Sequence, residues 1–191
     1  MEYRGRPLIH PETIAAWRDW LTKHHQDTDG VWLARWKRAS GKVPLDYALI
    51  VEEALCFGWI DGQATTLDDR RQAQLLTPRR RGSGWARSNK ERVERLIADG
   101  RMTEAGLRVI EAAKADGSWS LLDAAEALIE PVELGAALDA NPEARRHWDA
   151  FPESPRRALI IWVTSAKRPE TRRRRVASIV EEAAQGRRAN S

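Results

Sequence analysis

Residue patterns that favour β-strands are confined to residues 30–80. In GVWLARWK, side chains on the two faces alternate with a period of two, as in a half-buried strand. WIDGQATTLDD and RRQAQLLTPRR are two further β-prone runs around a polar DDRR turn, which indicates a hairpin. After Gly82-Ser83-Gly84 the pattern is helical to the end of the chain. The sequence therefore predicts an α+β fold with a small antiparallel sheet of about three strands, packed with helices and followed by a C-terminal all-helical part.

Capping residues predict where the helices begin and end. Pro11 opens the first helix, and the next has Asp46 as its N-cap and Gly58 as its stop. Ser88 and Glu91 have the spacing of a capping box before another apolar helical run. Further expected starts are Thr103, Ser154 with Pro155, and Pro169, and Gly186 is an expected end.

Pro131, after an acidic and apolar stretch, marks the expected boundary between two regions. Residues 1–130 then form an N-terminal α+β region, and residues 131–186 form a C-terminal helical region. Residues 187–191 are expected to be a disordered tail.

Composition favours a cytoplasmic protein. The single cysteine, Cys56, excludes an internal disulfide framework and fits a reducing compartment. No run approaches about 18 apolar residues, so membrane insertion is not expected. The formal net charge of +4 is modest and does not by itself indicate nucleic-acid binding.

Asp61, in the stretch CFGWIDG, has two interpretations. It is either a turn residue after a helix, with Gly62 permitting the geometry, or a functional carboxylate at the start of a strand beside Trp59. Both interpretations fit the local sequence.

A second candidate is the stretch TPRRRGSGW, with Asn89 behind it. Three consecutive arginines precede Ser83, Trp85 and the expected N-terminus of a helix. Helix N-termini attract anions, and arginines add charge-assisted contacts. The stretch therefore resembles an anion cradle, although its spacing is not that of a nucleotide-binding loop and a solvated surface is the alternative.

The third candidate is SAKRPETRRRR. On a helical wheel, Arg172 lies near the apolar stripe of the last helix while Arg174 points away from it. An inward arginine needs a counter-charge. Asp61, an anionic ligand or a structural salt bridge could each supply it.

No metal, cofactor or catalytic motif is recognised. The four histidines and Cys56 lack metal-ligand spacing, and no nucleophile elbow or dinucleotide-binding glycine motif is present. We therefore expect no metal and no cofactor. A binding protein is favoured over an enzyme, with Asp61 as a general base in the enzymatic alternative.

Three motifs, ALCFGWIDG, TPRRRGSGWARSNKERVERLIADGRM and SAKRPETRRRR, resemble those of the YdeI/OmpD-associated family, also called the bacteriocin-protection family. One departure is Ala86, where the family usually has serine. The resemblance implies a cytoplasmic protein linked to tolerance of cationic antimicrobial peptides and to an outer-membrane porin, with no established reaction. The ligand-binding candidates that it carries over are Trp59, Asp61, Arg79, Arg80, Ser83, Trp85, Asn89, Lys167, Arg168, Thr171 and Arg172.

These observations lead to one favoured function and two alternatives. The favoured one is binding of a small anionic ligand in a pocket lined by tryptophan, aspartate and arginine. One alternative is a protein-interaction module in an envelope-stress response. The other is non-specific nucleic-acid binding, motivated by net charges of +5 in residues 79–95 and in residues 167–175 but opposed by the lack of a DNA-binding motif. The ligand's identity and the oligomeric state stay open at this point.

Overall fold

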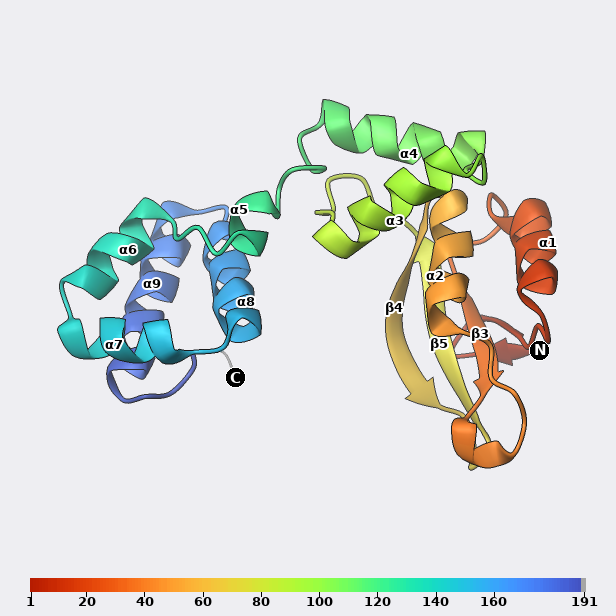
Figure 1. Ribbon diagram of the computed structural model, residues 1–191, viewed down its shortest axis with the longest axis horizontal. Helices are drawn as coiled ribbons and strands as arrows, with labels where there is room; N and C mark the ends of the chain where they lie inside the picture. Colours follow the sequence, from red (N-terminus) through yellow and green to blue (C-terminus); the bar gives the residue numbers. More distant parts are fainter. Residues whose placement is uncertain (190–191) are drawn as a thin grey trace. The chain divides into compact units, whose positions relative to one another are not determined.

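The computed structural model describes residues 1–189 and divides the chain into two compact units (Figure 1). Unit 1 spans Met1–Ser120 and unit 2 spans Leu121–Ser191. Each unit has its own hydrophobic core, and the two cores share no residue.

The sheet of unit 1 has five strands and is mixed, in the order β1-β2-β3-β5-β4. Neighbouring strands are antiparallel except for β2 and β3, which pair in parallel, with α1 as the crossover between them. The strands are β1 Glu2–Tyr3, β2 Arg6–Ile9, β3 Val31–Trp36, β4 Trp59–Thr66 and β5 Arg71–Pro78.

The predicted antiparallel sheet of about three strands is therefore wrong. The prediction found β3, β4 and β5 but missed the two short N-terminal strands, one of which makes the sheet mixed. Helices are also spread through the chain, because four of them pack in the same unit as the sheet. These are α1 Ile14–His24, α2 Tyr47–Cys56, α3 Arg87–Ala98 and α4 Glu104–Ala115, with a short 3-10 helix at Arg38–Ser40.

Local capping explains most of these helix starts. The side chains of Thr13, Asp46 and Thr103 each accept a hydrogen bond from a backbone N–H in the first turn of α1, α2 and α4. The predicted capping box at Ser88 is wrong, because α3 begins at Arg87 with no side-chain cap and Ser88 already lies in its first turn.

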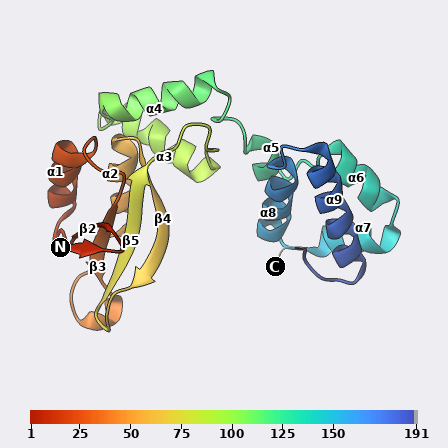
Figure 2. The same ribbon diagram turned by 180° about the vertical axis from the view of Figure 1, so that it is seen from behind.

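Helix α2 lies across one face of the sheet, in front of the strands in Figure 1 and behind them in Figure 2. Most of its residues are buried, and they pack with Val31, Leu33 and Leu76 of the sheet. Helix α4 approaches α2 closely at Gly106, where a Cβ would lie 2.3 Å from the carbonyl oxygen of Cys56. Only glycine fits this helix contact without a shift of backbone.

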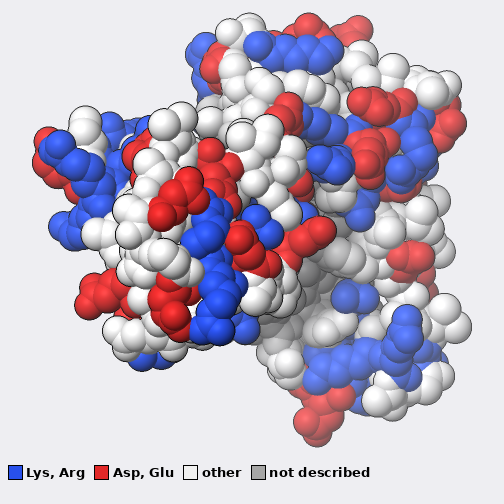
Figure 3. Space-filling model, turned by 60° about the vertical axis from the view of Figure 1, so that its left-hand side comes forward, with Lys and Arg blue, Asp and Glu red and all other residues white. Residues whose placement is uncertain are grey.

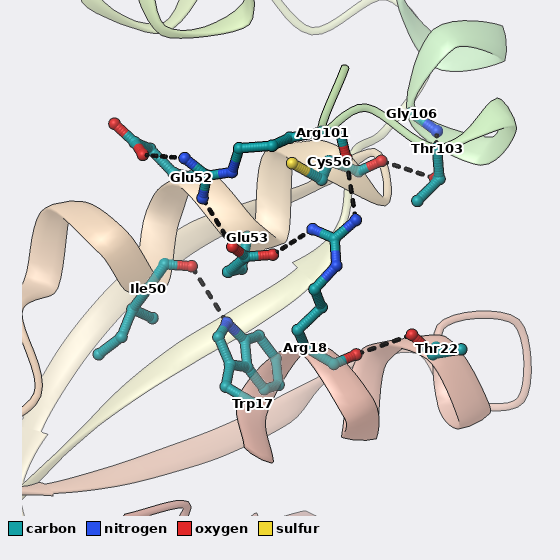
Figure 4. A network of polar contacts seen from close by, with 10 residues as sticks. All are labelled: Trp17, Arg18, Thr22, Ile50, Glu52, Glu53, Cys56, Arg101, Thr103 and Gly106. Carbon is teal, nitrogen blue, oxygen red and sulfur yellow. Dashed lines mark hydrogen bonds and ion pairs between the residues drawn. The ribbon is translucent and has the colours of Figure 1, made fainter. Parts of the chain in front are cut away.

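A buried ion-pair network joins α1, α2 and the segment after α3 (Figure 4). Glu53, only 4% exposed, accepts hydrogen bonds from Arg18 at 2.5 Å and Arg101 at 2.6 Å. Arg101 also binds Glu52, and the Cys56 thiol lies beside the network. Burial raises the pKa of this thiol, and the nearby Glu53 carboxylate raises it further.

Unit 2 is helical and is built around Trp148, which is fully buried. The indole N–H of Trp148 donates to Glu130 at 2.7 Å, and Arg145 holds the same carboxylate with two hydrogen bonds. No helix in residues 1–189 has the length and apolar character that a bilayer crossing needs. The helices of unit 2 are α5 Asp123–Glu126, α6 Val132–Asp139, α7 Pro142–Ala150, α8 Glu153–Thr164 and α9 Pro169–Ala184.

The predicted tail at residues 187–191 lies partly outside the described residues, which end at Ala189. Within the described part, Arg187 pairs with Glu182 at 2.7 Å and Ala189 is 5% exposed.

Candidate functional site

The predicted site residues fall into two groups, one in each unit. Seven lie in unit 1, between Trp59 and Asn89, and four lie in unit 2, between Lys167 and Arg172.

In unit 2, a carboxylate of the same unit is the partner of Arg172. Its guanidinium lies 3.1 Å from Glu133 of α6 and also donates to the carbonyl oxygen of Thr164 at 3.4 Å. Of the alternatives raised for Arg172, the structure thus contains a salt bridge within unit 2. Lys167 and Arg168 are exposed and form no ion pair within the described part of the chain, while Thr171 is half-buried.

In unit 1, Asp61 is a strand residue on the helix-covered face of the sheet. It stands in the same cross-strand row as Val31 and Leu76, both fully buried. The phenol of Tyr47, the first residue of α2, donates a hydrogen bond to Asp61. Burial and this hydrogen bond raise the pKa of Tyr47 to about 12, so the phenol keeps its proton at neutral pH. The sequence did not predict Tyr47 as a partner of Asp61, although it did predict the N-cap Asp46, which directly precedes Tyr47.

Arg79 is a partly buried cation that lies against an indole. Its guanidinium carbon lies 3.8 Å from the ring centroid of Trp85, and it donates to the carbonyl oxygen of Gly84. Trp85 is 1% exposed and packs against Trp119, with ring centroids 4.9 Å apart. Burial lowers the pKa of Arg79 to about 10, although Asp61 acts in the opposite direction.

Arg79 has no ion-pair partner within residues 1–189, and its buried Nε has no hydrogen-bond partner there. At neutral pH it is still protonated, because its pKa stays well above 7. It is therefore a partly desolvated positive charge that forms no ion pair with a described residue, although the charge of Asp61 acts on it.

Two adjoining cavities meet at Arg79. The smaller, of about 110 Å³, is lined by the arginine-rich segment and α4, and includes Arg80, Ser83 and Trp85. The larger, of about 430 Å³, shares Arg79 with it and has Phe57 and Trp59 in its walls. The fold thus brings five of the seven predicted residues of unit 1 to one place, which we call the Arg79 cavity.

Two predicted residues of unit 1 do not line the Arg79 cavity. Asp61 is engaged by Tyr47, and the side chain of Asn89 accepts a hydrogen bond from Arg92 at 2.9 Å. Ser83 lines it but donates its hydroxyl to the carbonyl oxygen of Arg80 at 2.7 Å.

Three guanidinium groups, those of Arg79, Arg80 and Arg81, line the smaller part of the Arg79 cavity, together with the carboxylate of Asp116, which pairs with Arg81 at 3.6 Å. A guanidinium is a planar donor that suits carboxylate and phosphate oxygens. No group of three or more histidine, cysteine, aspartate or glutamate side chains that could hold a metal ion occurs among residues 1–189.

Comparison with known proteins gives two family matches. Residues 9–109 match the family described as a domain of unknown function, DUF8412, and residues 127–186 match the one described as bacteriocin-protection, YdeI or OmpD-associated. No curated protein and no solved structure matches the chain.

The predicted relationship to the YdeI/OmpD-associated family is confirmed for residues 127–186. The first two motifs that suggested it lie instead in the segment matched by the other family. Because residues 9–109 are more than half of the 191-residue chain, the protein belongs to the DUF8412 family, and its unit 2 carries a YdeI/OmpD-associated domain.

Proposed function

We propose that unit 1 binds a small anionic molecule in the Arg79 cavity. The observation that carries the proposal is the guanidinium of Arg79, held against Trp85 with no carboxylate partner in the described residues. A buried charge without a partner is unfavourable, and an anion that joins it recovers part of that free energy.

The cavity walls indicate the shape of this anion. The smaller cavity, of about 110 Å³, has room for several water molecules and hence for a carboxylate or phosphate group. The adjoining space of about 430 Å³ is walled by Phe57, Trp59 and Val109. An anion with an apolar portion fits both parts, with its charge on Arg79 and its apolar portion on the aromatic rings.

A thermal-melt experiment tests this function. The wild type, Arg79→Gln and Arg174→Gln are melted with benzoate, short-chain carboxylates and inorganic phosphate. Arg174→Gln is the matched control, since it removes the same charge from an exposed position of unit 2. A ligand at a hundred times its dissociation constant adds roughly 2.7 kcal/mol of stability, which raises the melting temperature by several degrees.

We expect a carboxylate to stabilise the wild type and Arg174→Gln but not Arg79→Gln. A shift of equal size in Arg79→Gln would contradict the proposed site. So would the absence of any shift in the wild type across the panel.

We also propose that this binding supports tolerance of cationic antimicrobial peptides, through the ligand or a protein partner. The support is the description of the family matched by residues 127–186, which is bacteriocin-protection. Direct capture of a cationic peptide is disfavoured by the net charge of +4. On the face shown in Figure 3, lysine and arginine side chains are interspersed with aspartate and glutamate, so no continuous acidic surface for such a peptide lies there.

A survival assay tests this role. In a strain that lacks the gene, the wild-type protein should restore growth in the presence of a cationic peptide, and Arg79→Gln should not. Equal restoration by both proteins would show that tolerance does not depend on the Arg79 cavity.

A further inference from the structure

The helix-covered face of the sheet changes from apolar to polar along its length. Val31 stands beside Leu76 at one end of the β3–β5 ladder, and Arg35 stands beside Gln72 near the other. Residues in register share a face, so all four project from the same side of the sheet. The first two are fully buried, whereas Arg35 and Gln72 are only partly buried. The hydrophobic core therefore does not extend over this polar end.

A cleft of about 520 Å³ lies at the polar end, separate in its lining from the Arg79 cavity. Its walls come from β3, β5 and the segment that leads into α2. A neighbouring space of about 260 Å³ shares part of this wall. The polar side chains of the cleft are Arg35, Arg38, Asp46, Tyr47 and Gln72.

Three cations line this region, and the carboxylate of Glu12 lines the neighbouring space together with two of them. Arg35 and Arg38 line the cleft and Lys42 lines the neighbouring space, and none of the three forms an ion pair with a described residue. The one carboxylate in the cleft, Asp46, is committed to capping α2, where it accepts the backbone N–H of Ala48 at 2.8 Å. The cleft thus offers guanidinium groups to an anion.

The same cleft offers partners for hydroxyl groups. The hydroxyl of Tyr47 donates a hydrogen bond to Asp61, which fixes the phenol and leaves its oxygen as an acceptor. The guanidinium carbon of Arg35 lies 5.6 Å from the Tyr47 ring centroid, so the cation and the phenol share one site. Gln72 adds an amide that both donates and accepts.

We propose that this cleft binds a phosphorylated polyol, such as a sugar phosphate. Arg35 and Arg38 bind the phosphate oxygens, because guanidinium groups make paired, charge-assisted hydrogen bonds to phosphate. Tyr47 and Gln72 bind the hydroxyl groups. The walls of this cleft are polar, so its ligand differs from the anion with an apolar portion proposed for the Arg79 cavity. Neither proposal depends on the other.

Calorimetric titration with ribose 5-phosphate tests the proposal. The wild type is compared with Arg35→Gln, with Arg38→Gln and with Arg79→Gln, the last as a control in the other cavity. Arg38 is exposed, so its substitution tests the site even if Arg35→Gln fails to fold. Loss of one charge-assisted contact should weaken binding roughly tenfold to a hundredfold.

We expect saturable binding by the wild type, weaker binding by both cleft variants and unchanged binding by Arg79→Gln. Inorganic phosphate and free ribose should each bind at least about tenfold more weakly than ribose 5-phosphate, since each uses only half of the partners. The proposal is overturned if the wild type gives no saturable signal, or if Arg38→Gln binds as tightly as the wild type. Inorganic phosphate binding as tightly as ribose 5-phosphate would overturn the assigned ligand class.

Discussion

Replacing Glu53 with glutamine should destabilise unit 1 by about 1.5–3 kcal/mol, because this carboxylate is the centre of the network in Figure 4. The Glu53 side chain is 5% exposed and lies between Arg18 and Arg101, at 2.5 and 2.6 Å. Glutamine has the shape of glutamate but no charge. Its NH₂ group is a donor, and it would face the guanidinium of either Arg18 or Arg101, which is also a donor. One guanidinium would then lack its acceptor.

The magnitude follows from the exposure of the partners. Each hydrogen bond to a charged group contributes roughly 1.5–3 kcal/mol when it is sheltered from water. Arg18 and Arg101 are 35% and 32% exposed, so water replaces part of what they lose. Both bonds lose the carboxylate charge, so their sum of roughly 3–6 kcal/mol is reduced by about half, to about 1.5–3 kcal/mol.

Glu52→Gln is the matched control, since Glu52 neighbours Glu53 in α2 and also binds Arg101. Its other partner, Arg95, is 60% exposed, so we expect a loss of only about 1 kcal/mol or less. The assay is urea unfolding followed by tryptophan fluorescence, with the transition of unit 1 fitted separately. Trp17 is a suitable reporter, because its indole N–H donates to Ile50 of α2 beside the network. If Glu53→Gln lost no more stability than Glu52→Gln, the reasoning from burial would be refuted.

Three further substitutions have defined outcomes. Gly106→Ala should lower the free energy of unfolding by about 2–3 kcal/mol, because the alanine Cβ would overlap the carbonyl oxygen of Cys56. Urea unfolding measures this loss, and an unchanged urea midpoint would refute the close contact between α2 and α4. Tyr47 has a folded-state pKa raised from 10.0 to about 12, by burial and by Asp61, so the stability it contributes below pH 10 is lost as the pH rises towards 12. Tyr47→Phe should lack this alkaline loss in melts across that range, and identical profiles would contradict the assignment. Burial alone would raise the pKa of Glu130, but its hydrogen bonds outweigh burial and lower it. The stability it contributes above pH 4.5 is therefore lost as the pH falls further, and acid unfolding of unit 2 should be less steep in Glu130→Gln than in the wild type.

Features with local sequence signals were predictable. Asp46 caps α2 and Thr103 caps α4 through their side chains, as expected. Such signals depend on residues within one or two helical turns of each other, so they do not depend on how the rest of the chain folds.

The missed strands depend on distant residues. Strand β1 has two residues and β2 has four, one of them Pro7, so neither carries a pattern of useful length. Their place in the sheet is decided by β3, which pairs with β2 only after the α1 crossover. That pairing is set by tertiary packing, which no local window of the sequence contains.

The same distinction applies to the candidate sites. Arg79, Ser83 and Trp85 were found together because they lie within seven consecutive residues that line one cavity. The partners of Asp61 and Arg172, which are Tyr47 and Glu133, come from other elements. Residue type marked these side chains as candidates, but only the fold decided what each one meets.

The position of Cys56 makes its thiol a natural probe for transient opening of the core of unit 1. It is the single cysteine, it is fully buried at the end of α2 beside the Glu53 network, and burial raises the pKa of its thiol. A thiol reagent therefore has one target, and that target is unreactive until the helices separate. The labelling rate of the unmodified protein would thus time the transient exposure of this core, without any engineered probe.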